Sequence, residues 1–579
     1  MEDPEPNPPH ASLPSRIAAL VHAHFDALPS RCKPTIREDG SREWIPMSGI
    51  VVVKGEDTPS ETLTCVAVTT GARCLSSSHI PRCRGLVLHD CHAEILAIRA
   101  FNYWVLSECD SIIRHEQQAD NSQKDGKSSS TNDGSPFVRR RPRQTSSESG
   151  HESRDFWPPF EICPDVKIYM YCTCAPCGDA SMELCMAAQE DPTPWAVTPK
   201  PELQTDEGMT SNIPSVQNLL DGRAHFSILG VVRRKPARAD AESTLSKSCS
   251  DKLALRQVTS LLSYPASLLV APTENAYLAG LILPEEEISC VACDRAFGAG
   301  PTGRMRELAC RWWRNDGCRS DEKYGYRFRP FEVLSVPTET VEALWPYGKK
   351  KAEVIPTSSK GRKKNSGKPS NISAVWVIAP SSSSQVPFQM RSGSENEAKK
   401  HKVRAATTTG LVETIINGVK QGNQAASITA RGSSVLSRAK MWNLLRDIVT
   451  KILSPPSDND NDHDNAAVVS DDRGDASTSL KTNERDSYSR PWRTILEAPS
   501  YEQFKRPSEG FLEEEDGCSS IPIQLPPHLR LRKLAMQDAK RVLKPWIPNR
   551  GDEDWNVTEV IVADRRNKNV DRKVLKMES

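Results

Sequence analysis

His92 and Glu94 form the only His-x-Glu sequence in a chain that has 12 histidines. A histidine nitrogen can bind zinc, and a carboxylate two residues further along can take up and deliver protons during hydrolysis. The pair is short enough to arise by chance, and it also suits an ordinary polar first turn of a helix. A second motif is therefore needed before the pair indicates a metal site.

That second motif is the sequence YCTCAPCGDASM, which contains Cys177 in the only Pro-Cys of the chain. His-x-Glu followed by Pro-Cys matches the first part of the zinc-deaminase signature. The full signature would place a cysteine at position 180, where the chain has Ala180. Two candidates remain for the third ligand: spacing from Cys177 favours Cys174, and position at a helix start favours Cys249.

The proposed chemistry explains these residue types. Zinc with three protein ligands keeps a fourth position for water and lowers the pKa of that water toward neutrality. The positive end of a helix dipole favours thiolates and a developing oxyanion, so ligands at helix N-termini suit such a site. Glu94, which would not bind the metal, is the candidate that takes the water proton and passes it to the substrate.

The elements that would position these residues indicate an α/β fold. Residues 61–70 alternate as a strand does, and residues 166–172 form a second strand-like run. One helix is predicted from Asp90 as N-cap, a second after APCGDASM, and a third from SCSDK with an apolar face. Each predicted helix start carries a histidine or a cysteine, so these starts could bring three ligands together.

Composition limits the class of protein. Hydrophobic residues make up 37% of the chain and prolines number 43, which predicts one globular body with disordered insertions at residues 110–156, 349–371, 380–400 and 455–487. A net charge of +1 excludes a uniformly basic surface, so RNA binding would depend on local patches of Lys and Arg.

The expected compartment is reducing. The chain has 17 cysteines, several in apolar strand-like segments, which favours free thiols over a disulfide framework. No signal peptide and no membrane-spanning run are recognised. Residence in the nucleus or cytoplasm is therefore expected, and the basic runs at 349–351 and 360–364 favour the nucleus.

Three separated motifs, LHDCHAEILAIRAF, APCGDASM and RRKPARAD with SKSCSDKLA, resemble the deaminase domain of adenosine deaminases acting on RNA. The PCGDASM form is similar to that of the eukaryotic tRNA-specific adenosine deaminases. The resemblance implies a cytidine-deaminase-like mixed sheet with helices on both faces, elaborated by a helical C-terminal half. It also implies an N-terminal segment over residues 1–46 and a single editase domain over 47–579. The implied zinc ligands are His92, Cys177 and Cys249, and the implied catalytic residue is Glu94.

The resemblance further implies a buried inositol hexakisphosphate. Such a polyanion needs a closed nest of cations and aromatic side chains, because burying unpaired phosphates would cost far too much free energy. The matching positions are Arg99, Lys252, Lys368, Tyr501, Lys505, Lys540 and Trp546. Asp90 is predicted to pair with Lys252 and so to connect this nest to the metal site. The chain differs from the usual residues of the family at four positions, namely Ile98, Leu255, Arg256 and Met536.

Two loops resemble the substrate loops of the family. Gly71, Ala72 and Arg73 in TTGARC would approach a flipped nucleotide, and Lys235 and Arg238 in RRKPARAD would bind RNA. The implied function is zinc-dependent hydrolysis of adenosine to inosine in a tRNA anticodon loop, at the adenosine 3′ of the anticodon of alanine tRNA. No membrane contact and no DNA substrate are expected.

Three alternatives stay open at the level of the sequence. One is an editor of messenger or double-stranded RNA, although residues 1–60 leave no room for a double-stranded RNA-binding module before the first predicted strand. Another is a catalytically silent RNA-binding subunit, which would be expected to lack Glu94. The third is a structural zinc protein, which would need a fourth protein ligand. The sequence does not indicate an oligomeric state.

Overall fold

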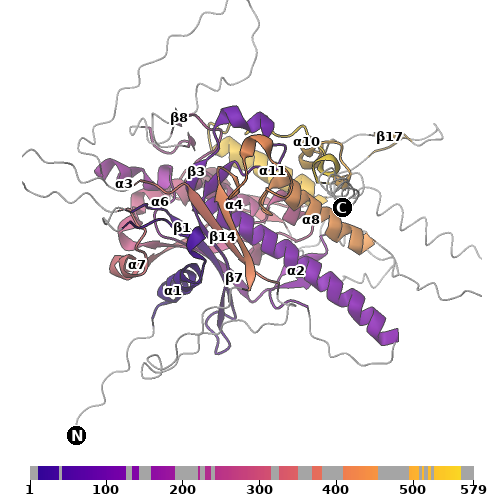
Figure 1. Cartoon of the computed structure of the whole chain (residues 1–579), viewed down its shortest axis with the longest axis horizontal. Helices are drawn as coiled ribbons and strands as arrows, with labels where there is room; N and C mark the ends of the chain where they lie inside the picture. The colour runs from indigo at the N-terminus through magenta and orange to yellow at the C-terminus, as the bar shows by residue number, and fades with distance from the viewer. Residues whose placement is uncertain are drawn as a thin grey trace, which may run out of the picture.

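The fold is built around one mixed β-sheet (Figure 1). The computed structural model describes residues 11–37, 42–124, 134–141, 158–188, 220–221, 228–235, 242–314, 325–349, 368–380, 409–453, 495–507, 511–513, 520–522 and 527–561. Within these residues the main sheet has eight strands in the order β13-β10-β7-β1-β2-β14-β15-β16. Strand β10 runs parallel to both β7 and β13, and the other pairs are antiparallel.

The strands of this sheet are β1 (Met47–Lys54), β2 (Thr62–Thr70), β7 (Val166–Cys172), β10 (Leu278–Pro284), β13 (Glu332–Val336), β14 (Ile372–Ile378), β15 (Gly410–Ile416) and β16 (Val419–Lys420). The predicted strands at 61–70 and 166–172 are confirmed as β2 and β7. The predicted mixed sheet is confirmed as well.

Helices cover both faces of the sheet, as predicted (Figure 1). The face that carries Ile50 and Val52 packs against α2 (Ala93–Lys124) and shares one hydrophobic core with α4 (Cys249–Thr259), α8 (Arg438–Leu453) and α11 (Pro527–Val542), of which α8 contacts α2 and α11 contacts α4. The face that carries Val51 and Val53 packs against α1 (Leu13–Asp26) and α7 (Thr338–Leu344). Adjacent residues of β1 enter opposite cores because side chains alternate along a strand.

Shorter elements complete the body. The helices are α3 (Met182–Ala187), α5 (Tyr264–Ser267), α6 (Cys290–Phe297) and α10 (Tyr501–Lys505). Two-stranded pairs join β3 (Ala72–Cys74) to β4 (Asp90–His92), β5 (Val138–Arg140) to β6 (Phe160–Ile162), β8 (Leu220–Asp221) to β9 (Arg233–Arg234), β11 (Trp312–Trp313) to β12 (Tyr326–Arg327), and β17 (Phe511–Glu513) to β18 (Ser520–Pro522).

The N-terminal segment is part of the same body, which the sequence interpretation missed. Strand β1 precedes the first predicted strand, and α1 lies over the sheet with Val21 against Gly49, where a Cβ atom would lie 2.6 Å from the valine methyl carbons. Val21 and Gly49 lie on opposite sides of the predicted boundary, yet they pack against each other. The boundary placed at residue 46 therefore does not separate the described part of this segment from the fold.

The first predicted insertion is also partly ordered. Helix α2 continues to Lys124, and β5, which also lies inside the range predicted to be disordered, pairs with β6 just beyond it. Arg140 pairs with Glu116 at 2.6 Å, so a residue of the supposed linker is held against the helix. The prediction of disorder for 110–156 is thus wrong for 110–124 and 134–141. Most of the other three predicted insertions lies outside the described residues.

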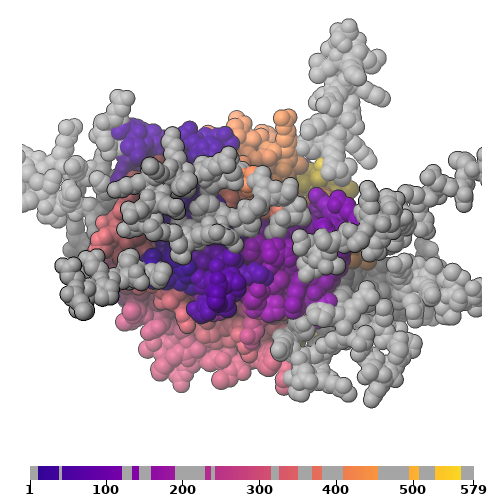
Figure 2. Space-filling model, turned by 90° about the horizontal axis from the view of Figure 1, so that it is seen from below, coloured from indigo at the N-terminus to yellow at the C-terminus, as the bar shows by residue number. Residues whose placement is uncertain are grey.

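Segments that are distant in sequence share one surface. Figure 2 shows residues near the N-terminus (indigo) beside α2 (violet) and residues from the middle of the chain (pink) on the same face. Among the described residues, no helix is both long enough and apolar enough to span a bilayer.

The packing of α1 generates a stability prediction. Phe25 is fully buried, and its ring centroid lies 4.8 Å from that of Trp345 and 5.9 Å from that of Tyr347. We expect Phe25→Ala to lower the free energy of unfolding by about 3–5 kcal/mol, because it removes this contact and leaves a cavity. Chemical denaturation measures the change, and the exposed control Ala23→Gln should stay within about 0.5 kcal/mol. A Phe25→Ala protein with an unchanged free energy of unfolding would show that α1 does not stabilise the fold.

Candidate zinc centre and the basic cluster beneath it

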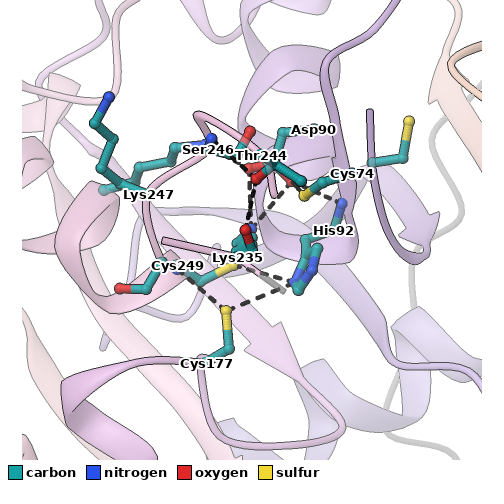
Figure 3. Close-up of polar contacts among 12 residues, drawn as sticks. Cys74, Asp90, His92, Cys177, Lys235, Thr244, Ser246, Lys247 and Cys249 are labelled. Carbon is teal, nitrogen blue, oxygen red and sulfur yellow. Dashed lines mark hydrogen bonds and ion pairs between the residues drawn. The ribbon is translucent and has the colours of Figure 1, made fainter. Parts of the chain in front are cut away.

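Three side chains from distant parts of the chain converge beside the sheet (Figure 3). The sulfur of Cys177 lies 3.7 Å from Nδ1 of His92, and the sulfur of Cys249 lies 3.6 Å from the same nitrogen. His92 ends β4, Cys177 lies in the turn after β7, and Cys249 opens α4. Among the described residues, Cys174 belongs to no such group. The geometry therefore favours Cys249 over Cys174 as the third ligand.

The donor set suits zinc. Two thiols and one imidazole, with their donor atoms all within 4.8 Å of one another, match the three protein ligands of a catalytic zinc site. The hydrogen bond with Cys249 holds the pKa of the Cys177 thiol well below its usual range, and the charges of Lys235 and His92 act in the same direction against burial. A thiolate at Cys177 is the form that binds metal.

Two glycines allow the ligands to approach. Gly178 has φ of +106°, and a Cβ atom there would lie 2.2 Å from Oγ of Ser248, so only glycine lets this turn meet the start of α4. Gly71 has φ of +153°, and a Cβ atom there would lie 1.9 Å from the carbonyl oxygen of Cys91. The carbonyl of Gly71 accepts from the amide of Ala93 at 2.9 Å, which fixes the first turn of α2 beside His92.

Gly71 was predicted to approach a nucleotide, but the structure buries it in this packing. Ala72 pairs with His92 in the β3–β4 ladder and is partly exposed, and Arg73 beside it is exposed. These two residues therefore lie at the rim of the metal centre. Arg238 lies outside the described residues.

Asp90 is a buried anion that pairs with two lysines, of which Figure 3 labels Lys235. Its carboxylate accepts from Nζ of Lys235 at 2.9 and 3.0 Å and also from Nζ of Lys252. Although burial alone would raise the pKa of Asp90, these two ammonium groups hold it well below its usual range. The predicted pairing of Asp90 with Lys252 is confirmed. The predicted N-cap role of Asp90 is wrong, because residues 90–92 form a strand and the helix begins at Ala93.

Lys235 is not where the sequence prediction placed it. It was expected to bind RNA, but its side chain is 3% exposed and its Nζ atom also lies 3.2 Å from the sulfur of Cys249. A buried lysine needs a counter-charge, and Asp90 provides it. Lys235 therefore lies between the Asp90 carboxylate and a candidate metal ligand, and its side chain is buried.

Glu94 occupies the first turn of α2, two residues after His92, and is only 4% exposed. Burial raises the pKa of Glu94, and negative charge at Cys177 acts in the same direction. It is absent from the groups of described residues that could hold a metal ion. A buried carboxylate with a raised pKa beside such a group is a candidate for taking up and releasing a proton.

A set of cations, called here the basic cluster, adjoins the metal centre through Lys252. Its members are Arg99, Lys247, Lys252, Arg256, Lys505, Arg532 and Lys540. Aromatic rings border it: Nζ of Lys505 lies 5.9 Å from the ring centre of Tyr501, and Nζ of Lys540 lies 6.0 Å from that of Trp546. Lys252 joins the cluster to Asp90 and so to the metal centre.

The basic cluster is poorly compensated by protein charge. Burial and the neighbouring cations Arg438 and Lys540 lower the pKa of Lys505 to about 7. Burial and the cations Arg532 and Arg99 likewise lower the pKa of Arg256 to about 9. In the described part of the chain, the phenol oxygen of Tyr264 and Nε of Arg532 are buried without a hydrogen-bond partner. These groups together have the chemistry of a site for a multiply charged anion.

The basic cluster and the aromatic rings that border it together include six of the positions predicted for inositol hexakisphosphate contacts, but not all seven. The six are Arg99, Lys252, Tyr501, Lys505, Lys540 and Trp546. Lys368 lies elsewhere, beside Arg73 at the rim of the metal centre. Sequence reasoning missed Lys247 and Arg532, and it treated Arg256 as a departure from the pattern. The basic residues that alternate in the sequence LRLRKLAMQDAK of α11 could have indicated Arg532.

The choice of the third ligand can be tested by metal content. We expect Cys249→Ala to lose stoichiometric zinc, because it removes one of the three convergent donors. Cys174→Ser should keep zinc, since Cys174 lies outside the convergent group of described residues. Elemental analysis of both purified variants, beside the unchanged protein, measures the difference. Zinc lost from Cys174→Ser and kept in Cys249→Ala would reverse the assignment.

The comparisons with known proteins agree with this site. A family model described as the adenosine-deaminase (editase) domain matches residues 67–133 and 143–317. The tRNA-specific adenosine deaminase 1 of Schizosaccharomyces pombe is 35% identical over 327 residues, which are 56% of this chain and 68% of the relative. The protein of the same name from Saccharomyces cerevisiae is 30% identical over 256 residues, 44% of this chain and 55% of the relative.

A mouse protein named double-stranded RNA-specific editase B2 is more distant, at 25% identity over 246 residues, which are 41% of this chain and 26% of the relative. The model match spans His92, Cys177 and Cys249, the three residues that the fold brings together. With these ligands, the buried Glu94 carboxylate and the similarity to the fission-yeast protein, the chain belongs to the adenosine-deaminase (editase) family.

Proposed function

We propose that the chain converts adenosine to inosine in tRNA by hydrolysis. The observation that carries the proposal is the convergence of His92, Cys177 and Cys249 next to the buried carboxylate of Glu94. The names of the two yeast relatives support tRNA as the substrate. Hydrolysis adds water to C6 of adenine and releases ammonia, so a group that moves protons is needed as well as a metal.

Each described residue of the centre has a part in this reaction. His92, Cys177 and Cys249 would hold zinc, which supplies Lewis-acid activation of water when bound. Glu94 takes a proton at its carboxylate and delivers protons to the adenine ring and then to the leaving amine. Burial raises the pKa of Glu94, which favours uptake of a proton by its carboxylate.

The proposed target is the adenosine 3′ of the anticodon of alanine tRNA, on the basis of the family resemblance. A loop base is already unpaired, so turning it into the site costs less free energy than extracting it from a duplex. Ala72 and Arg73 lie at the rim through which such a base would enter. The basic runs that favour the nucleus are almost entirely outside the described residues, and nuclear residence stays a prediction.

The basic cluster is proposed to hold inositol hexakisphosphate. Its cations would otherwise repel one another in a buried position, which costs several kcal/mol for each unpaired charge. Lys505 retains exposed surface even though burial lowers its pKa to about 7. A compact ligand with many phosphates would supply the missing negative charge.

The catalytic proposal is tested by Glu94→Gln. The amide keeps the shape of the side chain but cannot accept a proton, so inosine formation should fall by roughly 10²- to 10⁴-fold. Zinc content and folding should persist. Sequencing of unmodified tRNA after incubation measures inosine, and the exposed control Glu285→Gln should retain full activity. Full turnover by Glu94→Gln would refute the role, and inosine formed only in duplex RNA would refute tRNA as the substrate.

The polyanion proposal is tested by the composition of the purified protein. Acid extraction of the unchanged protein should release an inositol polyphosphate that chromatography can identify. Lys505→Met and Lys540→Met should lower the amount released and the midpoint of thermal unfolding, because each removes a cation from the site. The control Lys533→Met changes an exposed lysine of the same helix, α11, and should alter neither measurement. An extract without any inositol polyphosphate would refute the proposal.

A further inference from the structure

A hollow of about 360 Å³ lies at the rim of the metal centre, lined by Glu43, Arg73, Lys368, Pro369 and Asn371. Three chain segments meet there. The amide of Trp44 donates to the carbonyl of Lys368 at 3.0 Å, and the guanidinium of Arg73 donates to the carbonyl of Pro369 at 3.3 Å. These two hydrogen bonds hold the residues of the hollow next to the segment that leads into β1.

The pairing of β3 with β4 places the hollow close to the candidate metal ligands. Arg73 pairs with Cys91 in the β3–β4 ladder, and its neighbour Ala72 pairs with the metal-ligand candidate His92. Residues directly opposite in an antiparallel pair have Cα atoms about 4.5–5.5 Å apart. A strand of RNA that places one nucleotide at the metal centre would therefore pass next to Arg73.

The side chains of the hollow have unused binding capacity. Within the described residues, neither Lys368 nor Glu43 makes a side-chain ion pair, although Lys368 is exposed and Glu43 half-buried. Lysine and arginine bind phosphate, whereas a carboxylate and an amide can bind amino or hydroxyl groups of a nucleotide. A volume of about 360 Å³ lies within the range of small-ligand sites.

We propose that this hollow binds the nucleotide adjacent to the reacting adenosine, an inference that rests on the proposed function. Arg73 and Lys368 hold its phosphate, and Glu43 and Asn371 contact its base edge or ribose hydroxyl. Phosphate contacts position the strand, while the carboxylate and amide make the site sensitive to which nucleotide flanks the target. The hollow is thus a specificity site, and Lys368 belongs to it and not to the basic cluster.

The phosphate contact is tested by RNA affinity. Lys368→Gln should weaken binding of an unmodified anticodon stem-loop and reduce the slope of log affinity against log salt by about 1, because one counterion-releasing contact is lost. Fluorescence anisotropy at several salt concentrations measures both. The control Lys533→Gln removes an equally exposed lysine outside the hollow and should leave the slope unchanged. An unchanged affinity and slope for Lys368→Gln would overturn the phosphate contact.

The recognition of the flanking nucleotide is tested with stem-loops that differ only at the positions on either side of the adenosine. Glu43→Gln should change the ratio of affinities among these RNAs at one flanking position by roughly 10-fold, since a carboxylate accepts where an amide can also donate. Equal ratios for Glu43→Gln and the unchanged protein would overturn the specificity role. These binding measurements do not need turnover, so absence of inosine with the unchanged protein would refute the proposed function separately.

Discussion

The Asp90 carboxylate is the interaction on which the rest of the site depends. It is buried, it accepts from Lys235 and Lys252 together, and its backbone belongs to the strand that ends at His92. Lys235 reaches from Asp90 to the sulfur of Cys249, while Lys252 leads from Asp90 into the basic cluster. Removing one partner of a buried ion pair leaves an uncompensated charge, so the metal centre and the basic cluster are energetically linked through this one anion.

The basic cluster also explains why the chain forms one body. Its cations come from α2, from α4 and the residue before its N-cap, and from α10 and α11 near the C-terminal end of the described chain. Repulsion among them would push these helices apart, whereas a shared anion would draw them together. The aromatic stack of Tyr501 on Trp555, with ring centroids 4.8 Å apart, joins the C-terminal segment to the same region. Binding of a polyanion would thus act as a folding constraint across the C-terminal half.

Sequence patterns predicted the parts of the structure that rest on local rules. The strands β2 and β7 and the apolar face of α4 follow from periodicity, and Leu253, Ala254 and Val258 of this helix are fully buried. Leu261, which the same spacing assigned to the helix, is also buried but follows the end of α4 at Thr259. Strand β1 was missed because MSGIVVVK is buried on both faces and shows no alternation. The choice between Cys174 and Cys249 stayed open because it depends on Gly178 packing against Ser248, a contact across 70 positions that no local pattern contains. Lys235 was misplaced because an isolated lysine suggests solvent until its distant partner is known.

The placement of charge around the metal centre follows from these long-range contacts. Two thiol ligands bring negative charge to the site once they are deprotonated, and the ammonium of Lys235 lies 3.2 Å from the sulfur of Cys249. Glu94 therefore faces a centre whose nearby anions disfavour its own ionisation, as the effect of Cys177 on its pKa indicates. If Lys235 were exposed at an RNA surface, this positive charge would be screened by water and could not balance the thiolate. The buried ammonium of Lys235 thus supplies positive charge at the place where the Asp90 carboxylate and the sulfur of Cys249 come close together.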